Sequence, residues 1–304
     1  MRVFLTGATG YMGRVVLEKL LDSGIDVLAL ARPSSRSAMP TRPGLAWAQG
    51  TLDDADAIGK AVRQTDAAMH MAAQHDFHMQ KLDWAAITAI GQALEGTGKP
   101  FIATSATPVY GHTGDEPRDE HEPVEHPHPL RTFRLQHDRF VIGLRERDVR
   151  GVVVRPPLVY GRSGGFLVTL INQAIEDRTA RTIGNGTNRW STVDVDDLAD
   201  LYVRALLAED AYGAFNAGSR DVVSMKVIAE TIAQSFGPKI PVGSWTEQEA
   251  CARLGELMAL MSLDQHVSSE RARSELGWNP RATTLIEDLS HGSYRLAPLV
   301  PYSH

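Results

Sequence analysis

Short apolar runs alternate with amphipathic stretches through the first half of the chain. An apolar run at residues 3–6 is followed by a pattern in which apolar side chains recur on one helical face. The alternation continues, with further apolar runs at residues 25–31, 45–49, 66–73, 101–104 and 151–155, and with a helix expected at residues 81–96. Strands that alternate with helices predict an α/β fold with a doubly wound parallel sheet and right-handed crossovers.

The second half of the chain has more helical than strand-like patterns. Apolar positions at helical spacing predict helices at residues 166–177, 225–236 and 246–261. Asp196 and Asp197 stand where an acid would cap another helix. Ser268 and Gly277 mark the expected start and end of a shorter helix.

Three glycines form a turn directly after the first predicted strand. Gly7 allows the tight turn, Gly10 lets the backbone approach a ligand, and Gly13 lets the next helix pack close to the strand. The first turn of that helix offers free N–H groups and a positive dipole end to a pyrophosphate. Because the turn lies between a strand and a helix, the sequence predicts a dinucleotide site here.

Composition and charge narrow the class of protein. The 304 residues are 43% hydrophobic and 22% charged, which is ordinary for a globular enzyme. The net charge of −6 argues against a protein that generally binds nucleic acid or anionic membranes. The single cysteine, Cys251, excludes an internal disulfide and a cysteine-based zinc cluster. No leader and no apolar run near the length of a membrane span is present, so a cytoplasmic location is expected.

A His-rich acidic segment at residues 112–129 is a further candidate for metal binding. Its four histidines lack ligand spacing on a regular element, and its prolines spread them apart. We therefore expect a solvated loop at the rim of the active site, with no bound metal.

The segment from Thr6 to Gly13, with the spacing Gly-x-x-Gly-x-x-Gly, resembles the fingerprint of the atypical and extended short-chain dehydrogenase/reductases. Residues 98–105 and the Arg-Pro-x-x-Val-Tyr-Gly segment at 155–161 are also similar to the NAD-dependent epimerase/dehydratase-like members of that family. The resemblance runs from residue 1 to about residue 294. It implies a Rossmann-type sheet, a nicotinamide cofactor and a small-molecule substrate, and homodimers formed through helices occur in the family.

The resemblance also implies how the chain divides. Residues 1–160 would form the NADP-binding domain, to which residues 188–218 return. Residues 161–187 and 219–297 would form a smaller, mostly helical substrate-binding domain.

The end of the second strand bears on the choice of cofactor. An NAD site usually places a carboxylate here for the ribose 2′-hydroxyl, whereas this chain has Arg32, Ser34, Ser35 and Arg36. These side chains suit a 2′-phosphate through charge-assisted hydrogen bonds, so we expect NADP(H) rather than NAD(H). A solvated basic loop is the alternative explanation.

Other cofactor contacts are implied by position in the family pattern. Thr51 replaces an acid that touches adenine in the family, which leaves Leu52 as the contact in that corner. The backbone after Pro156 is expected to meet the carboxamide. The full set of expected cofactor residues is Thr6, Gly7, Thr9, Gly10, Tyr11, Met12, Gly13, Arg32, Ser34, Ser35, Arg36, Leu52, Ala72, Ala73 and Pro156.

The family's catalytic Tyr and Lys are both replaced. Leu130 falls on the Tyr position and cannot transfer a proton. Arg134 falls on the Lys position, where it could hold a ribose hydroxyl, but its pKa is too high for acid–base chemistry at neutral pH. Ser105 is the nearest match to the residue whose hydroxyl holds the substrate carbonyl, and Thr107 is the alternative because Pro108 leaves the register open. Another proton donor would be needed, and the candidates are Tyr110, Tyr160, His75 and His137.

Substrate-pocket candidates follow strand ends and turns of the predicted sheet. His75 and Asp76 come directly after the fourth strand, and ligands in such folds bind outside the carboxyl ends of strands. The alternative to a pocket role is a loop residue without function for His75 and Asp76, and a packing residue for Trp190. The expected pocket residues are His75, Asp76, Thr107, Asn188, Arg189 and Trp190.

Three functions fit this pattern. The first is an NADP(H)-dependent oxidoreductase that acts on a small carbonyl, alcohol or related group, with Ser105 orienting the substrate and Arg134 fixing the ribose. The second, favoured by the missing Tyr, is an isomerase, lyase or cyclase on the same fold without net hydride transfer. The third is a non-catalytic NADP-binding protein.

Overall fold

A parallel sheet of seven strands carries the glycine turn, which follows its strand β1. The computed structural model describes residues 1–32, 41–72, 77–236 and 240–296. The strand order is β10-β6-β5-β4-β1-β2-β3, and every neighbouring pair in this sheet is parallel. The strands are β1 (Arg2–Thr6), β2 (Asp26–Ala31), β3 (Leu45–Gln49), β4 (Ala67–His70), β5 (Pro100–Thr104), β6 (Arg150–Arg155) and β10 (Gly213–Asn216). The predicted α/β, Rossmann-type doubly wound sheet is confirmed.

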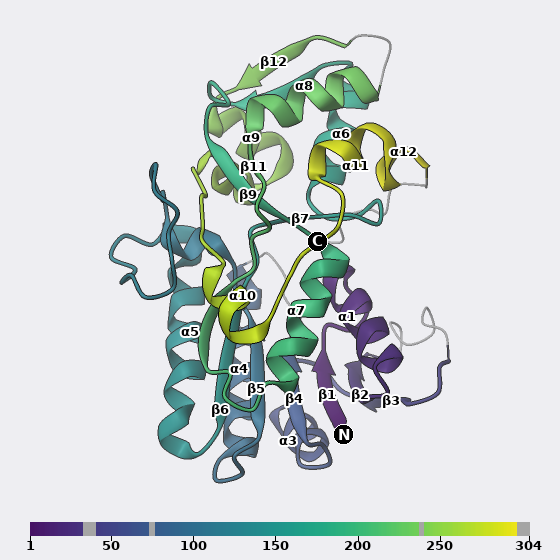
Figure 1. The fold of residues 1–304 in the computed structure, drawn as a ribbon, viewed down its shortest axis with the longest axis vertical. Helices are drawn as coiled ribbons and strands as arrows, with labels where there is room; N and C mark the ends of the chain where they lie inside the picture. Colours follow the sequence, from purple (N-terminus) through teal and green to yellow (C-terminus); the bar gives the residue numbers. More distant parts are fainter. Residues whose placement is uncertain (33–40, 73–76, 237–239, 297–304) are drawn as a thin grey trace.

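Helices cover both faces of this sheet (Figure 1). They are α1 (Tyr11–Asp22) and α7 (Val195–Leu207) on one face, and α3 (Ala55–Val62), α4 (Phe77–Leu94) and α5 (Thr132–Gly143) on the other. Within β1, Val3 and Leu5 pack on the α1 side while Phe4 packs on the α4 side, as the two-residue period of a strand requires. Burial on both faces explains why these strands are apolar without alternation.

A second hydrophobic core lies beyond the carboxyl ends of the strands, at the top of Figure 1. Its helices are α6 (Leu167–Glu176), α8 (Met225–Ser235), α9 (Glu247–Leu254), α11 (Leu285–His291) and α12 (Ser293–Leu296), together with the 3-10 helix η4 (Glu256–Ser262). Two small sheets accompany them, formed by β7 (Leu158–Tyr160), β9 (Arg189–Asp194) and β11 (Val222–Ser224), and by β8 (Ala180–Ile183) and β12 (Val242–Trp245). None of the described helices combines the length and apolar character needed to cross a membrane.

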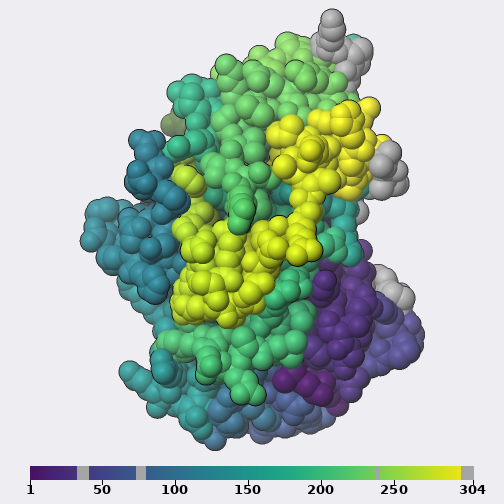
Figure 2. Space-filling model, viewed as in Figure 1, coloured from purple at the N-terminus to yellow at the C-terminus, as the bar shows by residue number. Residues whose placement is uncertain are grey.

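The chain crosses between the two cores several times. After β9 it enters α7 and β10 of the main sheet, and α10 (Glu270–Leu276) then packs beside α7. Figure 2 shows the yellow C-terminal segment lying across this face, from α10 up to α11 and α12. The crossings place short connecting segments, including those that follow Pro156 and Tyr160, directly above the strand ends.

Several predicted helix ends differ from the structure. The helix expected at residues 246–261 is broken at Gly255, whose φ of +94° cannot continue a helix, so α9 ends there and η4 follows. Helix α4 begins at Phe77 and ends at Leu94, earlier than the expected 81–96. Asp196 and Asp197 are not the caps of α7, because the side chain of Asp194 accepts the Asp196 N–H instead. The Asp197 carboxylate accepts from the backbone N–H groups of Arg281 and Ala282, both at 2.8 Å.

Candidate active site

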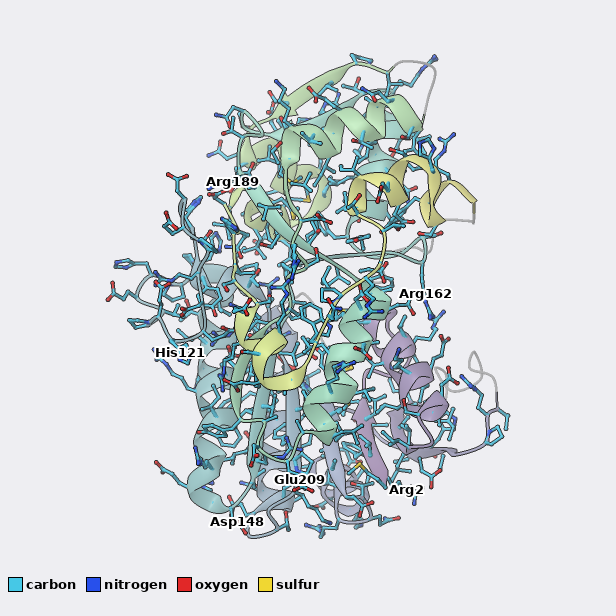
Figure 3. All side chains as sticks on the ribbon, viewed as in Figure 1. Arg2, His121, Asp148, Arg162, Arg189 and Glu209 are labelled. Atoms are coloured by element: carbon cyan, nitrogen blue, oxygen red, sulfur yellow. The ribbon has the colours of Figure 1, made fainter. Side chains whose placement is uncertain are left out.

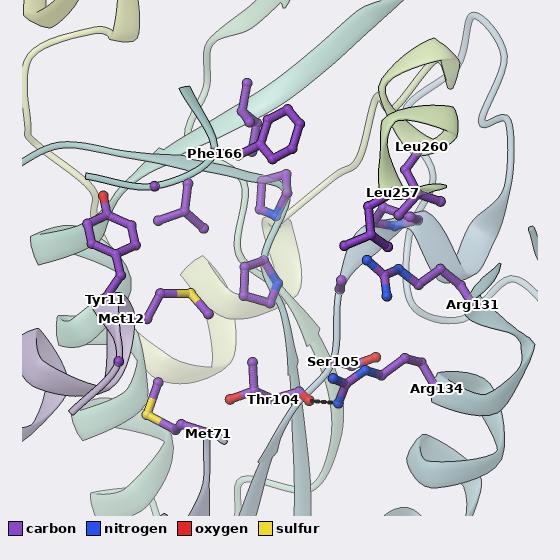
Figure 4. A pocket seen from close by; sticks show the side chains of 18 of the residues that line it. Tyr11, Met12, Met71, Thr104, Ser105, Arg131, Arg134, Phe166, Leu257 and Leu260 are labelled. Atoms are coloured by element: carbon purple, nitrogen blue, oxygen red, sulfur yellow. Dashed lines mark hydrogen bonds between the residues drawn. The ribbon is translucent and has the colours of Figure 1, made fainter. Parts of the chain in front are cut away.

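A pocket lies where the carboxyl ends of the main strands meet the second core (Figure 4). Its floor comes from the glycine turn and the ends of β4, β5 and β6, and its roof from the loop after β7 and from η4. The lining residues that carry the argument below are Gly7, Gly10, Tyr11, Met12, Gly13, Ser105, Arg131, Arg134, Pro156, Phe166, Trp190, Leu257, Leu260 and Met261. Residues expected for cofactor and for substrate therefore line one continuous pocket.

The glycine turn provides an open cradle at one end of the pocket. Gly7 has a φ of +78°, and a Cβ there would lie 2.5 Å from the Ala72 nitrogen. A Cβ on Gly13 would collide with the carbonyl oxygen of Gly7. Helix α1 starts at the N-cap Gly10, without a side-chain cap and without an acid in its first turn. The free N–H groups of this helix end are left for an anion, which fits the pyrophosphate of a dinucleotide.

Tyr11 connects the cradle to the second core. Its hydroxyl donates to the carbonyl of Gly161 at 2.8 Å, and its ring lies so close to Gly164 and Gly165 that a side chain at either position would contact it. Burial and the neighbouring Tyr294 raise the pKa of Tyr11 well above its usual value. The Tyr11 hydroxyl therefore stays protonated and links the glycine turn to the second core through its hydrogen bond to Gly161. Arg162, labelled in Figure 3, adds an exposed link at the same junction by pairing with Glu18 and Asp196.

Arg134 belongs to a buried charged cluster beneath the pocket. Its Nη1 lies 2.8 Å from Asp83 Oδ2, and the other carboxylate oxygen lies 2.6 Å from His70 Nε2. His70 Nδ1 in turn is 2.9 Å from Thr6 Oγ1. Burial by itself raises the pKa of Asp83, but the Arg134 guanidinium and the adjacent histidine rings outweigh burial and hold this pKa well below its usual range. Asp83 thus stays ionised and fixes the guanidinium that faces the pocket.

Ser105 follows β5 and is buried, with 7% of its surface exposed. Its hydroxyl has no hydrogen-bond partner among the described residues, and Figure 4 shows it beside Arg134 at the pocket. A hydroxyl kept without a protein partner at a pocket is suited to a ligand oxygen. Thr107, the alternative considered for this role, is fully buried and lies outside the described pocket lining.

Two of the tyrosines considered as proton donors have their hydroxyl groups engaged elsewhere. The Tyr110 hydroxyl donates to Asn216 Oδ1 at 3.0 Å and accepts from Arg155 at 2.7 Å. The Tyr160 hydroxyl donates to the Thr283 carbonyl in the second core. Neither residue is among the described pocket-lining residues. His137 is buried and stacks on Trp84, and its Nδ1 lies 3.3 Å from Asp83 Oδ2, the oxygen that also pairs with Arg134.

The three expected pocket residues at 188–190 have different surroundings, and only Trp190 lines this pocket. Trp190 lines the pocket, with 3% of its surface exposed. Asn188 donates to the carbonyls of Met261 and Leu263, and so holds η4 in place. Arg189, labelled in Figure 3, is absent from the described lining of this pocket and pairs with Asp264 at 2.6 Å. Arg189 and Trp190 differ because β9 sends successive side chains to opposite faces.

The remaining cofactor candidates are absent from the described pocket lining or lie outside the described residues. The Ala72 N–H donates to Thr6 Oγ1 at 3.4 Å, and the Thr9 carbonyl accepts from Arg14. Leu52 packs against the core on the α4 side. Arg32 is exposed directly after β2. The predictions for Ser34, Ser35, Arg36, Ala73, His75 and Asp76 lie outside the described residues.

Sequence reasoning missed two charged residues that shape the site. Asp83 shares one face of α4 with Ile87 and Ile90, and a single acid at helical spacing among buried apolar residues was the available signal. Arg131 is buried and lines the pocket from the start of α5. The sequence could have indicated Arg131 as a site residue because it is a cation at a helix N-terminus, where the helix dipole favours a negative charge.

Asp194, at the junction beneath Gly161, gives a pH-dependent prediction. Burial, with Asp196 and Asp197 nearby, raises the pKa of Asp194 to about 6. The folded state thus holds this proton more tightly than the unfolded chain, so the stabilisation is complete below about pH 4 and is lost as the pH rises through 6. Asp194→Asn, which keeps a capping side chain, is expected to be more stable than the parent above pH 6.5 by about 1–2 kcal/mol. Urea unfolding at pH 4.5 and 7.5 measures this, and an equal effect of the substitution at both pH values would contradict it.

The fold and the open glycine cradle define a protein of the dinucleotide-binding, Rossmann-type class. The model of the NAD dependent epimerase/dehydratase family matches residues 3–218, and the chain belongs to this family. An uncharacterised protein of Schizosaccharomyces pombe is 35% identical over 300 residues, which cover 97% of this chain and all of that protein. A UDP-glucose 4-epimerase of Mycolicibacterium smegmatis is 25% identical, over 92% of this chain and 94% of its own length.

The solved structure of dTDP-glucose 4,6-dehydratase from Bacillus anthracis in complex with NAD shares the fold. Its TM-score is 0.79 at 14% sequence identity, over 97% of this chain and 95% of that one. The similarity therefore includes both the main sheet and the second core.

Proposed function

We propose that this protein binds a nicotinamide dinucleotide and transfers hydride between it and a small carbonyl or alcohol substrate. The observation that supports this most is the continuity of the pocket, which joins the glycine cradle to Ser105 and Arg134. The NAD in the Bacillus anthracis dehydratase of the same fold supports the cofactor. Residues 161–187 and 219–297 would provide the substrate-binding part.

Each residue in the pocket then has a distinct task. The N–H groups at the start of α1 bind the pyrophosphate, and the backbone after Pro156 meets the carboxamide. Arg134, held by Asp83, hydrogen-bonds the nicotinamide ribose. The Ser105 hydroxyl holds the substrate oxygen, while the cofactor supplies the hydride chemistry. Apolar residues of η4 close the pocket against water.

Arg32 is proposed to select NADP(H). It follows β2, and β2 is the parallel neighbour of β1, so Arg32 lies at the same sheet edge as the glycine cradle. Arg32→Asp is expected to weaken NADPH binding by about tenfold or more, because a charge-assisted contact to the 2′-phosphate is replaced by repulsion. NADH binding should change little. Calorimetric titration of both nucleotides measures the two affinities.

Arg42→Asp is the matched control for this experiment. Arg42 is half-buried, and it pairs with Asp22, the last residue of α1. Equal losses of NADPH affinity in the two variants would indicate a general charge effect rather than recognition by Arg32. Failure of the parent to bind either nucleotide would overturn the proposed function itself.

A second candidate function is isomerisation, elimination or cyclisation on the same fold without net redox change. It is favoured by Leu130 at the usual Tyr position and by the engagement of the Tyr110 and Tyr160 hydroxyls outside the pocket. Product formation without a net change in nicotinamide absorbance would identify it. Tight nucleotide binding with no turnover of any substrate would instead indicate a non-catalytic binding protein.

A further inference from the structure

Arg134 ends a row of buried polar side chains that begins beside the glycine turn. Thr6, His70 and Asp83 are each at most 3% exposed, and none of them is among the described residues that line the pocket. Arg134 is buried as well but lines the pocket, and Figure 4 shows it beside Ser105. The row therefore connects the residue before Gly7 to the guanidinium at the pocket.

The main sheet places Thr6 and His70 side by side. Strands β1 and β4 are parallel neighbours, and their register pairs Thr6 with His70. Thr6 follows Phe4 by two residues, so its side chain points to the α4 side of the sheet, where Asp83 lies. The His70 ring joins the two, because its Nδ1 lies 2.9 Å from Thr6 Oγ1 and its Nε2 lies 2.6 Å from Asp83 Oδ1.

The two oxygens of the Asp83 carboxylate meet different partners. Oδ1 lies beside His70, whereas Oδ2 lies 2.8 Å from Arg134 Nη1. The terminal torsion of an aspartate has a broad preference, so a carboxylate with one partner can turn. The contact with His70 fixes the plane of this carboxylate and, with it, the position of the guanidinium. Thr6 fixes the ring in the same way, because it contacts the second ring nitrogen.

An Arg at position 134 depends on such support more than the Lys of the family pattern would. An ammonium is a compact charge with three rotatable donors, whereas a guanidinium donates in fixed directions within one plane. A tilt of that plane would therefore misdirect its hydrogen bonds to a ligand. Asp83 sets the tilt, and His70 sets Asp83.

Resting on the proposed function, in which Arg134 binds the nicotinamide ribose, we infer that His70 and Thr6 are positioning residues for the nicotinamide half of the cofactor. They act through the Asp83 carboxylate and the Arg134 guanidinium. Loss of either contact weakens binding of the half of the dinucleotide that carries nicotinamide. It leaves binding of the adenosine half unchanged.

The test compares NADPH with 2′,5′-ADP, which shares the adenosine and the 2′-phosphate but has no nicotinamide ribose. Calorimetric titration of the full chain measures both affinities, with NADH and ADP as the pair if the parent prefers NADH. The Gln amide reaches about as far as His Nε2, whereas the Asn amide reaches only as far as Nδ1. His70→Asn should weaken NADPH binding by about tenfold and 2′,5′-ADP binding by less than about twofold. His70→Gln should keep NADPH affinity within about threefold of the parent.

Thr6→Val gives a second, milder test, because it replaces one hydroxyl by a methyl group of similar size and stays informative if a His70 variant fails to fold. It should weaken NADPH binding by about fivefold with little change for 2′,5′-ADP, and Thr6→Ser should restore most of the loss. Thr65→Val is the matched control. It also removes a buried threonine hydroxyl, one that donates to the Val62 carbonyl before β4 begins. It should leave the ratio of the two affinities unchanged.

A double variant tests whether His70 acts through Arg134. In a protein that already carries Arg134→Gln, His70→Asn should cause no further loss of NADPH affinity. Equal losses for NADPH and 2′,5′-ADP, a His70→Gln variant as weak as His70→Asn, a changed ratio in Thr65→Val, or a further loss in the double variant would overturn the inference. A parent that binds no nucleotide would overturn the proposed function instead.

Discussion

Gly13→Ala is expected to weaken dinucleotide binding strongly and to destabilise the fold by about 3 kcal/mol or more. The added methyl group would collide with the carbonyl oxygen of Gly7, which is backbone and cannot rotate away. Either α1 moves off β1 or the turn at Gly7 opens, and each change disrupts the cradle for the pyrophosphate. Affinity for the nicotinamide nucleotide should fall by roughly a hundredfold, since the N–H groups no longer converge. Urea unfolding and calorimetric titration measure the two effects.

Gly143→Ala is the matched control. Gly143 is the last residue of α5, it is exposed, and a Cβ there would meet nothing within 4 Å. Alanine should leave nucleotide affinity unchanged and raise stability slightly, by up to about 1 kcal/mol, because it favours the helix. Similar behaviour of the two variants would show that close helix–strand approach at Gly13 is not what the site requires.

Asp83→Ala is expected to cost about 3–5 kcal/mol of stability, because it leaves the buried Arg134 guanidinium without its carboxylate. Nucleotide affinity should fall as well, since Asp83 no longer fixes Arg134, which is proposed to bind the ribose. Urea unfolding at pH 7, with nucleotide titration on the folded variant, measures both effects. Asp22→Ala, which breaks only the exposed pair with Arg42, should change stability by less than about 1 kcal/mol.

The same carboxylate predicts how the protein responds to acid. The pKa of Asp83 is held below its usual value, so its contribution to stability is complete above about pH 4 and is lost as the pH falls below that. The loss of stability between pH 5 and pH 3 should be smaller in Asp83→Asn than in the parent. An identical acid dependence in the two proteins would show that Asp83 is not ionised in the folded state.

The sheet and the glycine cradle could be predicted from the sequence, because both depend on local patterns. Apolar runs between amphipathic helices predict strands buried on both faces, and β1 shows this with Phe4 and Leu5 on opposite sides. The spacing of Gly7, Gly10 and Gly13 predicts a close helix–strand turn, since only glycine tolerates that contact. Some helix ends were predicted less well, and the break at Gly255, where φ is +94°, was missed.

Which polar side chains share the pocket depends on how distant segments of the chain pack together. Asp83 and Arg134 lie on two different helices, and no local pattern states that α4 and α5 bring them to 2.8 Å. The tyrosines at 110 and 160 follow strand ends as the family pattern does, yet their hydroxyls find partners at Asn216 and Thr283, far along the chain. Burial requires each polar group to find a partner, and those partners are set by packing between distant segments rather than by sequence spacing.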